Sequence, residues 1–350
     1  MSIQRSAAIL SIVAVVMAAC SSPGASASGT GSCKVGVAWA TFQEERYKLR
    51  DEPGLKGAVE AGGGTYVGNG ADNKAETQAS NVAALIAAGI NVLVLNAVDP
   101  VAVLPSLQTA LDAGIPVIAY DRELESDKVL FLTHDNVEVG RMIARAVTAV
   151  QPTGNYVIIK GDKTQTNPIF LRDGMQDILK PFLDSGAIKI VAEEFTDGWK
   201  AENAQTEMEN ILTAHPDVQA VLSENDNMAT GVTAALNGNA DGKVKIGAQD
   251  GDTFGLNRVA LGTQVVSVWK DSTELGTAAG KAALELCKNP DISKVTGAIP
   301  QKTTGGLASY GLLLNPVPIT KDNLQVVLDA KWITKDVLCK DVTPGSVKGC

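Results

Sequence analysis

Polar side chains follow the ends of at least six apolar segments of this 350-residue chain. They occur at Asp121-Arg122, His134-Asp135-Asn136, Gly161-Asp162 leading to Asn167, Glu224-Asn225-Asp226, Gln249-Asp250 and Trp269-Lys270. In open parallel sheets, ligands bind outside the carboxyl ends of the strands. No single position is informative, because polar residues also end strands and cap helices for structural reasons. Six of them together predict one polar binding edge.

These residue types suit a ligand that carries several hydroxyl groups. A carboxylate accepts hydrogen bonds, a guanidinium donates a planar fork, and an amide both donates and accepts. A sugar also has apolar faces, against which flat rings pack. The chain is only 4% aromatic, and each of its rings could pack in a core instead. The candidates for stacking are Trp39, Tyr47 and Trp199.

From Lys34 onward, short apolar runs alternate with amphipathic stretches. Strands are expected at 35–39, 91–96, 115–120, 156–159, 188–192, 218–223, 244–248 and 265–268. Helices are expected near 137–150, 169–182, 201–214, 228–236, 253–260 and 274–286, and the Gly-rich segment 302–311 is expected to be a loop. Continuous apolar strands separated by helices imply parallel sheets covered on both faces. Because the alternation restarts after about residue 133, we expect two α/β lobes.

Residues 1–20 have the features of a bacterial lipoprotein signal peptide. Arg5 precedes an apolar run of about 13 residues, which is too short to span a bilayer comfortably. The run ends in Met-Ala-Ala-Cys20, so we expect Cys20 to carry lipid, ordinary cleavage beside an incidental cysteine being the alternative. Residues 21–33 read as a flexible tether. The expected location is extracytoplasmic, secreted and attached to the cell membrane only through the lipid on Cys20.

Four further cysteines are present, and an even number in an oxidising compartment predicts two disulfides. They are Cys33, Cys287, Cys339 and Cys350. Three pairings are possible. The local pairing of Cys339 with Cys350 would leave Cys33 with Cys287. None of these cysteines has metal-ligand spacing, so no metal site is expected, and no cofactor is expected either.

Several classes of function are disfavoured. The net charge of −9 argues against a nucleic-acid binder. No G-x-G-x-x-G follows the first strand, so the dinucleotide phosphate cradle is missing. Of the two histidines, His215 precedes a proline in an expected turn, and a structural role is expected for His134. An enzyme is therefore not expected, and a sugar-responsive repressor would need a DNA-binding headpiece where the signal sequence stands.

Five short motifs occur in one order between about Lys34 and Leu286. They are Glu45-Arg46-Tyr47, Ala119-Tyr120-Asp121-Arg122, Asp197-Gly198-Trp199 followed by Glu202-Asn203-Ala204, Asn225-Asp226 and Gln249-Asp250. In these motifs the chain resembles the D-xylose-binding branch of the ribose/galactose-type periplasmic binding proteins. The resemblance implies an α/β fold of two doubly wound parallel-sheet lobes joined by a three-strand hinge (periplasmic binding protein type I). The expected N-terminal lobe is 34–132 plus 271–310, and the expected C-terminal lobe is 133–270 plus 311–350.

The resemblance also implies which residues bind a sugar. The N-terminal lobe would contribute Arg46, Asp121 and Arg122, and the C-terminal lobe would contribute Asn167, Trp199, Asn225 and Asp250. Lys270 would bind from the hinge. Tyr47 and Trp199 would stack on the two faces of the sugar ring. The implied function is the substrate-binding lipoprotein of an ABC sugar importer, a monomer that binds D-xylose and delivers it to a permease.

The chain departs from the relative at the mouth of the implied site. Tyr47 stands where the relative has Trp, Trp39-Ala40-Thr41 replace its Ile-Asp-Asp, and 161–168 differ. Glucose, another pentose or another hexose therefore stays open as the ligand, as does a role in chemoreception.

Overall fold

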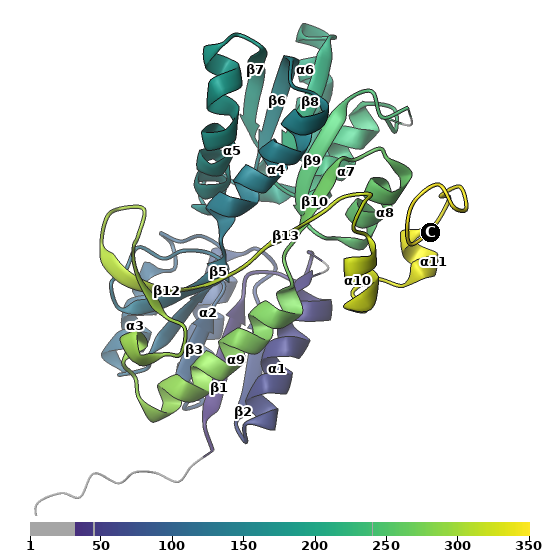
Figure 1. The fold of residues 1–350 in the computed structure, drawn as a ribbon. Helices are drawn as coiled ribbons and strands as arrows, with labels where there is room; N and C mark the ends of the chain where they lie inside the picture. The colour runs from purple at the N-terminus through teal and green to yellow at the C-terminus, as the bar shows by residue number, and fades with distance from the viewer. Residues whose placement is uncertain (1–31, 45, 240) are drawn as a thin grey trace, which may run out of the picture. The chain divides into compact units, whose positions relative to one another are not determined.

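The structure is a computed structural model that describes residues 32–44, 46–239 and 241–350. Within these residues, the first of two sheets has seven strands in the order β11-β12-β5-β4-β3-β1-β2. They are β1 (Lys34–Trp39), β2 (Thr65–Gly70), β3 (Val92–Leu95), β4 (Val117–Tyr120), β5 (Val129–His134), β11 (Ile299–Lys302) and β12 (Ala308–Leu314). Only β11 runs antiparallel to its described neighbour, β12. The helices of this lobe are α1 (Glu52–Ala61), α2 (Ala75–Ala87), α3 (Leu104–Asp112) and α9 (Ser272–Lys288) (Figure 1).

The second sheet has six described strands in the order β13-β10-β9-β8-β6-β7, with β13 antiparallel to β10. They are β6 (Gly154–Lys160), β7 (Ile188–Phe195), β8 (Val218–Ser223), β9 (Lys245–Asp250), β10 (Val266–Trp269) and β13 (Val317–Ile319). Its helices are α4 (Asn136–Val150), α5 (Asn167–Asp184), α6 (Ala201–Ala214), α7 (Asp226–Ala235) and α8 (Thr253–Leu261). Short helical segments are η1 (Tyr47–Asp51), η2 (Asp197–Trp199), η3 (Ile292–Lys294), α10 (Gln325–Asp329) and α11 (Lys335–Leu338).

The periodicity of the sequence explains elements such as β3, β4 and α4. Every residue of β3 and β4 is buried, as expected for parallel strands with helices on both faces. Helix α4 buries Val139, Ile143 and Val147, which recur at four-residue spacing on one face. The same helix begins where the Asp135 carboxylate accepts a hydrogen bond from the Glu138 amide at 2.9 Å.

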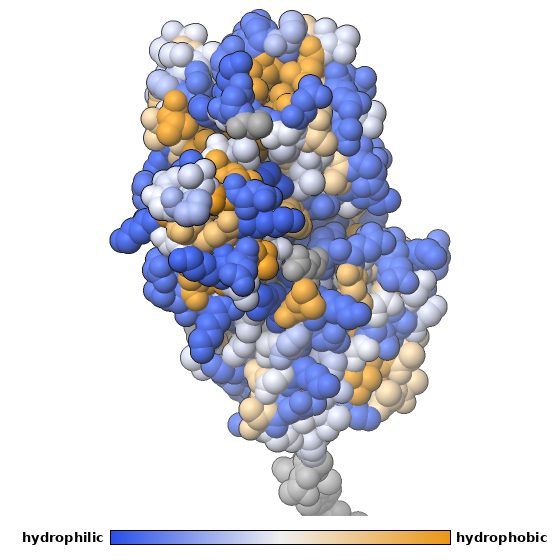
Figure 2. Space-filling view, turned by 90° about the vertical axis from the view of Figure 1, so that its right-hand side faces the viewer, coloured by the Kyte–Doolittle hydropathy of each residue, from blue (hydrophilic) through white to orange (hydrophobic). Residues whose placement is uncertain are grey.

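On the face drawn in Figure 2, hydrophilic residues predominate and hydrophobic ones form only small groups.

The chain passes between the two sheets three times. The connections are Asp135 between β5 and α4, 270–271 between β10 and α9, and 315–316 between β12 and β13. The prediction of two α/β lobes is confirmed. The expected lobe limits at 132/133 and 310/311 fall inside β5 and β12, and both strands belong to the first sheet.

One local prediction differs from the structure, and strand β2 was missed. The loop expected at 302–311 is wrong, because its ends belong to the antiparallel pair β11 and β12. Tertiary contacts create this strand: β12 pairs with β5, and the Ser309 hydroxyl donates to the Val129 carbonyl at 3.0 Å. Strand β2 was not predicted, because its two glycines and half-exposed residues give no apolar run.

Both disulfides expected from the local pairing are present. Cys33, before β1, is bonded to Cys287 in α9, and Cys339 is bonded to the terminal Cys350. The predicted signal peptide, with Cys20, lies outside the described residues, as does most of the predicted tether. Among the helices that the structure describes, none is both long and apolar enough to cross a membrane.

Candidate functional site

The nine side chains predicted for the site line one cavity together. The cavity has an empty volume of about 360 Å³, counted with its opening to solvent. The nine are Arg46, Tyr47, Asp121, Arg122, Asn167, Trp199, Asn225, Asp250 and Lys270. They come from both lobes, because Asp121 follows β4 while Asn225 and Lys270 follow β8 and β10. The polar edges of the two sheets therefore face a shared space.

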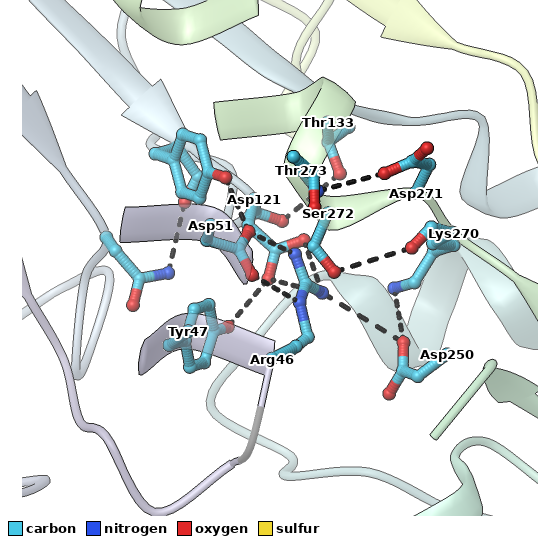
Figure 3. A network of polar contacts seen from close by, with 12 residues as sticks. Arg46, Tyr47, Asp51, Asp121, Thr133, Asp250, Lys270, Asp271, Ser272 and Thr273 are labelled. Carbon is cyan, nitrogen blue, oxygen red and sulfur yellow. Dashed lines mark hydrogen bonds and ion pairs between the residues drawn. The ribbon is translucent and has the colours of Figure 1, made fainter. Parts of the chain in front are cut away.

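Arg46, immediately before η1, links the carboxylates of this space (Figure 3). Its Nη2 lies 2.8 Å from Asp51 Oδ1 and its Nε lies 3.1 Å from Asp51 Oδ2. Its Nη1 lies 3.4 Å from Asp121 Oδ1 and 4.0 Å from Asp250 Oδ1. The two-point bond to Asp51, which is fully buried, fixes the plane of the guanidinium. Arg46 thus contacts carboxylates from both lobes.

Asp121 is held as a hydrogen-bond acceptor. The Tyr47 hydroxyl donates to Asp121 Oδ2 at 2.7 Å. Burial by itself would raise the pKa of Asp121, but the charges of Arg46 and Lys270 and the Tyr47 hydroxyl hold this pKa well below its usual range. The carboxylate therefore stays ionised at any physiological pH.

Lys270 and Asp250 form the second ion pair of the cavity. Their Nζ and Oδ1 atoms lie 2.9 Å apart, and both side chains are at most 11% exposed. Lys270 lies in one of the three connections between the sheets, while Asp250 ends β9. This pair therefore joins a connection between the lobes to the end of β9.

Three residues of the cavity have left-handed backbone conformations that only glycine adopts easily. The φ angles are 63° for Asp121, 58° for Trp199 and 100° for Asp250. Such conformations cost about 1–3 kcal/mol each and concentrate at functional sites. The backbone strain therefore lies at three residues whose side chains line the cavity.

Trp199 presents its ring to the cavity from η2. The ring nitrogen donates to Gln165 Oε1 at 3.0 Å, and the side chain is 7% exposed. The ring lies directly over Gly161, where an added Cβ would be 2.1 Å from the ring carbons. Trp199 also packs with the core of its lobe, so it serves both the core and the cavity.

The two aromatic candidates of the first lobe differ in position. The Tyr47 ring lines the cavity and packs against Trp39, with the ring centroids 5.9 Å apart. Trp39 is fully buried in the core and does not line the cavity, so its prediction as a stacking candidate was wrong. Its position on an apolar strand places it between Tyr47 and Tyr120.

Asn225, Asn167 and Arg122 each use at least one polar side-chain atom in a hydrogen bond to another group of the protein. Asn225 Oδ1 caps α7 by accepting from the Met228 amide at 2.8 Å, which leaves its Nδ2 for other partners. Asn167 Nδ2 donates to the Asp121 carbonyl at 3.0 Å, a bond between the lobes. Arg122 Nη1 donates to the Ala97 carbonyl at 2.7 Å.

Glu44, Gln165 and Gln249 also line the cavity and were not predicted as site residues. Gln249 could have been predicted from the sequence, since it stands beside Asp250 at a strand end. Glu44 and Gln165 could not, because both lie in loops whose path the sequence does not specify. In the described chain, three atoms of cavity-lining residues are buried without a hydrogen-bond partner, namely Glu44 Oε2, Gln249 Oε1 and Asp250 Oδ1, the last of which forms the ion pair with Lys270.

His134 is fully buried and does not line the cavity. In the described parts of the chain, no group of three or more His, Cys, Asp or Glu side chains could hold a metal ion.

Comparison with known proteins gives matches over most of the chain. The D-xylose-binding periplasmic protein of Escherichia coli (strain K12) is 34% identical over 296 residues, which are 83% of this chain and 88% of that protein. A multiple sugar-binding periplasmic receptor of Rhizobium radiobacter is 30% identical, covering 84% of this chain and 88% of the receptor.

A solved structure shows the same fold. The ABC transporter solute-binding protein of Clostridium phytofermentans with bound β-D-glucose is 27% identical, with a TM-score of 0.78, covering 87% of this chain and 99% of that one. The family model described as a periplasmic binding protein domain matches residues 35–291. These matches confirm the predicted resemblance and the prediction of a binding protein rather than an enzyme. The chain belongs to the periplasmic binding protein domain family.

Proposed function

We propose that this chain binds one monosaccharide between its lobes, with D-xylose as the preferred ligand. The observation that carries the proposal is the single cavity where Arg46, Asp121 and Asp250 meet beside the ring of Trp199. Charged groups give directional hydrogen bonds to hydroxyls, and an aromatic ring offers a surface for the apolar face of a sugar. The relatives named for D-xylose and for multiple sugars support this class of ligand.

The proposed mechanism is closure of two lobes over the ligand. Groups from both lobes line the cavity, so a sugar that contacts both favours the closed arrangement by its differential contacts. The connections at Asp135, 270–271 and 315–316 act as the hinge. In this proposal the N-terminal lobe carries the first sheet and the C-terminal lobe carries the second.

The proposed setting is an ABC sugar importer. The chain acts outside the cytoplasm as a monomer, anchored by lipid on Cys20, and a permease recognises the rims of the closed lobes. The family membership and the ABC transporter neighbour support the transport role. The lipoprotein features of residues 1–20 support the anchor.

A thermal-shift screen of the full chain over monosaccharides tests the proposal. A ligand that binds only the folded protein raises its melting temperature. D-xylose is expected to give the largest rise, with D-glucose in the same panel because a 27% identical neighbour was solved with β-D-glucose. A panel in which no monosaccharide raises the melting temperature would contradict the proposal.

A further inference from the structure

We propose that Glu44 is a further ligand-contacting residue, which determines the preferred sugar by hydrogen-bonding one ligand hydroxyl through Oε2. This inference rests on the proposed function and refines it. Glu44 lies in the segment between β1 and η1 and lines the cavity. It therefore occupies a position from which a side chain can contact a ligand.

Glu44 differs from the other carboxyls around the cavity in its partners. Asp51 and Asp121 are each within 3.4 Å of Arg46, and Asp250 is 2.9 Å from Lys270. Glu44 Oε2 and Asp250 Oδ1 are both buried without a hydrogen-bond partner among the described residues, but only Glu44 Oε2 also lacks an ion-pair partner there. Buried polar groups are nearly always hydrogen-bonded, so this oxygen is the carboxyl atom most available to a ligand hydroxyl.

The charges that line the cavity show where Glu44 differs from its neighbours. The lining has three cations, Arg46, Arg122 and Lys270, and three carboxyls, Glu44, Asp121 and Asp250. Each aspartate lies within ion-pair distance of Arg46 or Lys270, as Figure 3 shows. The balanced charge of the lining suits an uncharged ligand such as a sugar.

Burial supports the same picture. It raises the pKa of Glu44 above its usual value, because desolvation, with a small contribution from Asp250, exceeds the opposing effects of Arg122, of a hydrogen bond from the residue's own backbone and of Arg46. The raised pKa widens the pH range in which Glu44 is protonated, and a protonated carboxyl donates as well as accepts a hydrogen bond. The pKa of Asp121, by contrast, is lowered, so Asp121 only accepts.

A selective contact of this kind affects some sugars and not others. A site that hydrogen-bonds a particular hydroxyl discriminates strongly against an analogue that lacks it, because the protein group is then left unpaired. Loss of the contact should change the ratio of affinities between sugars. Loss of folding or of lobe geometry would weaken all sugars together.

Calorimetric titration of the full-length wild type and its Glu44→Ala and Glu44→Gln variants tests the inference. The ligands are D-xylose, its monodeoxy analogues and D-glucose. We expect Glu44→Ala to weaken D-xylose by about tenfold or more and to leave unchanged the affinity for the one deoxy analogue that lacks the contacted hydroxyl. Glu44→Gln, which keeps the shape and a donor, should stay within about threefold of wild type.

Glu207→Ala is the matched control. Glu207 is also half-buried and burial also raises its pKa, but it accepts from Thr196 at 2.6 Å and does not line the cavity. Its affinity for every sugar should equal that of wild type. A Glu44→Ala variant that weakens all ligands by the same factor, or none of them, would overturn the role of Glu44 while leaving the proposed function intact. A wild type that binds no monosaccharide would overturn the proposed function and this inference with it.

Discussion

Asp250 is the residue at which both lobes and one of their connections meet. Its Oδ1 lies 2.9 Å from Lys270 Nζ and 4.0 Å from Arg46 Nη1, and its own backbone is strained, with φ at 100°. A charged group held so firmly between two cations is a strong acceptor for a ligand hydroxyl. The affinity for sugar should therefore depend on this side chain more than on an uncharged one.

Asp250→Ala should weaken sugar binding by about 2–4 kcal/mol, because it removes a charged acceptor and leaves buried donors unpaired. Calorimetric titration measures the change. Asp250→Asn, which keeps an acceptor oxygen, is the matched variant and should lose less. Unchanged affinity in Asp250→Ala would remove Asp250 from the site.

Gly161→Ala should weaken sugar binding by about tenfold without unfolding the lobe. The added Cβ would lie 2.1 Å from the Trp199 ring, which must move from its place at the cavity. Titration and tryptophan fluorescence report the change. The control is Gly57→Ala in α1, where nothing lies within 4 Å of the added carbon. Wild-type affinity in Gly161→Ala would mean that the position of this ring does not matter to the ligand.

The sequence revealed those site residues whose place follows from strand ends. Asp121, Asn225 and Asp250 directly follow or end apolar runs, and the carboxyl ends of parallel strands meet at one edge. Their partners were not visible in the same way. The bonds from Arg46 to Asp51 and from Asn225 to the Met228 amide, and the position of Glu44 in the cavity, depend on loop paths and side-chain directions.

Among the elements, the C-terminal segment after β13 makes an unexpected contact between the lobes. The Arg50 guanidinium of η1 lies 4.6 Å from the ring centroid of Trp332, and its Nη2 donates to the Trp332 carbonyl at 2.5 Å. The Trp332 ring nitrogen donates to the Gly251 carbonyl at 2.6 Å, next to Asp250. This contact therefore holds η1 against the second lobe at the edge of the cavity.

Arg50→Ala should weaken sugar binding by roughly twofold to thirtyfold, because a stacked cation of this kind contributes about 0.5–2 kcal/mol to the closed arrangement. Titration of the variant with D-xylose measures the effect. Lys48→Ala is the control, since Lys48 is exposed on the same short helix. A loss of the same size in both variants would show that the contact with Trp332 is not responsible.

The element predictions succeeded where one helix or strand carries its own pattern. In helix α4 and strand β4, the pattern of apolar residues directly predicts which positions are buried. Strand β12 carries no such pattern, because its place in the sheet depends on pairing with β5, far away in the sequence. The short helices α10 and α11 were missed for a related reason, since they pack through Trp332 and a disulfide-closed segment rather than through a repeated apolar face.

At the scale of the whole molecule, two buried groups, His134 and Asp226, make stability depend on pH in opposite directions. Burial, with Lys270 and Arg46 nearby, lowers the pKa of His134 well below its usual value, although Asp121 opposes this. Both ring nitrogens are buried without a hydrogen-bond partner in the described chain. Burial also raises the pKa of Asp226 to about 6. Acid therefore weakens the contribution of His134 and strengthens that of Asp226.

His134 should make the protein less stable as the pH falls below about 6.5. Its pKa is lower in the folded than in the unfolded state, so the unfolded state binds the extra proton and gains stability in acid. Between pH 7 and pH 5.5 the free energy of unfolding should fall by about 1 kcal/mol more in wild type than in His134→Gln. Denaturant unfolding at both pH values measures the difference, with His215→Gln as control. Parallel pH profiles for wild type and His134→Gln would contradict this.

A calorimetric titration of the full-length protein with D-xylose tests directly whether the two lobes close over one uncharged sugar. We expect one site per chain with a dissociation constant of about 1 μM or less. We also expect a negative heat-capacity change, as surface of both lobes leaves water. The absence of saturable heat with D-xylose and with every other monosaccharide would contradict this expectation.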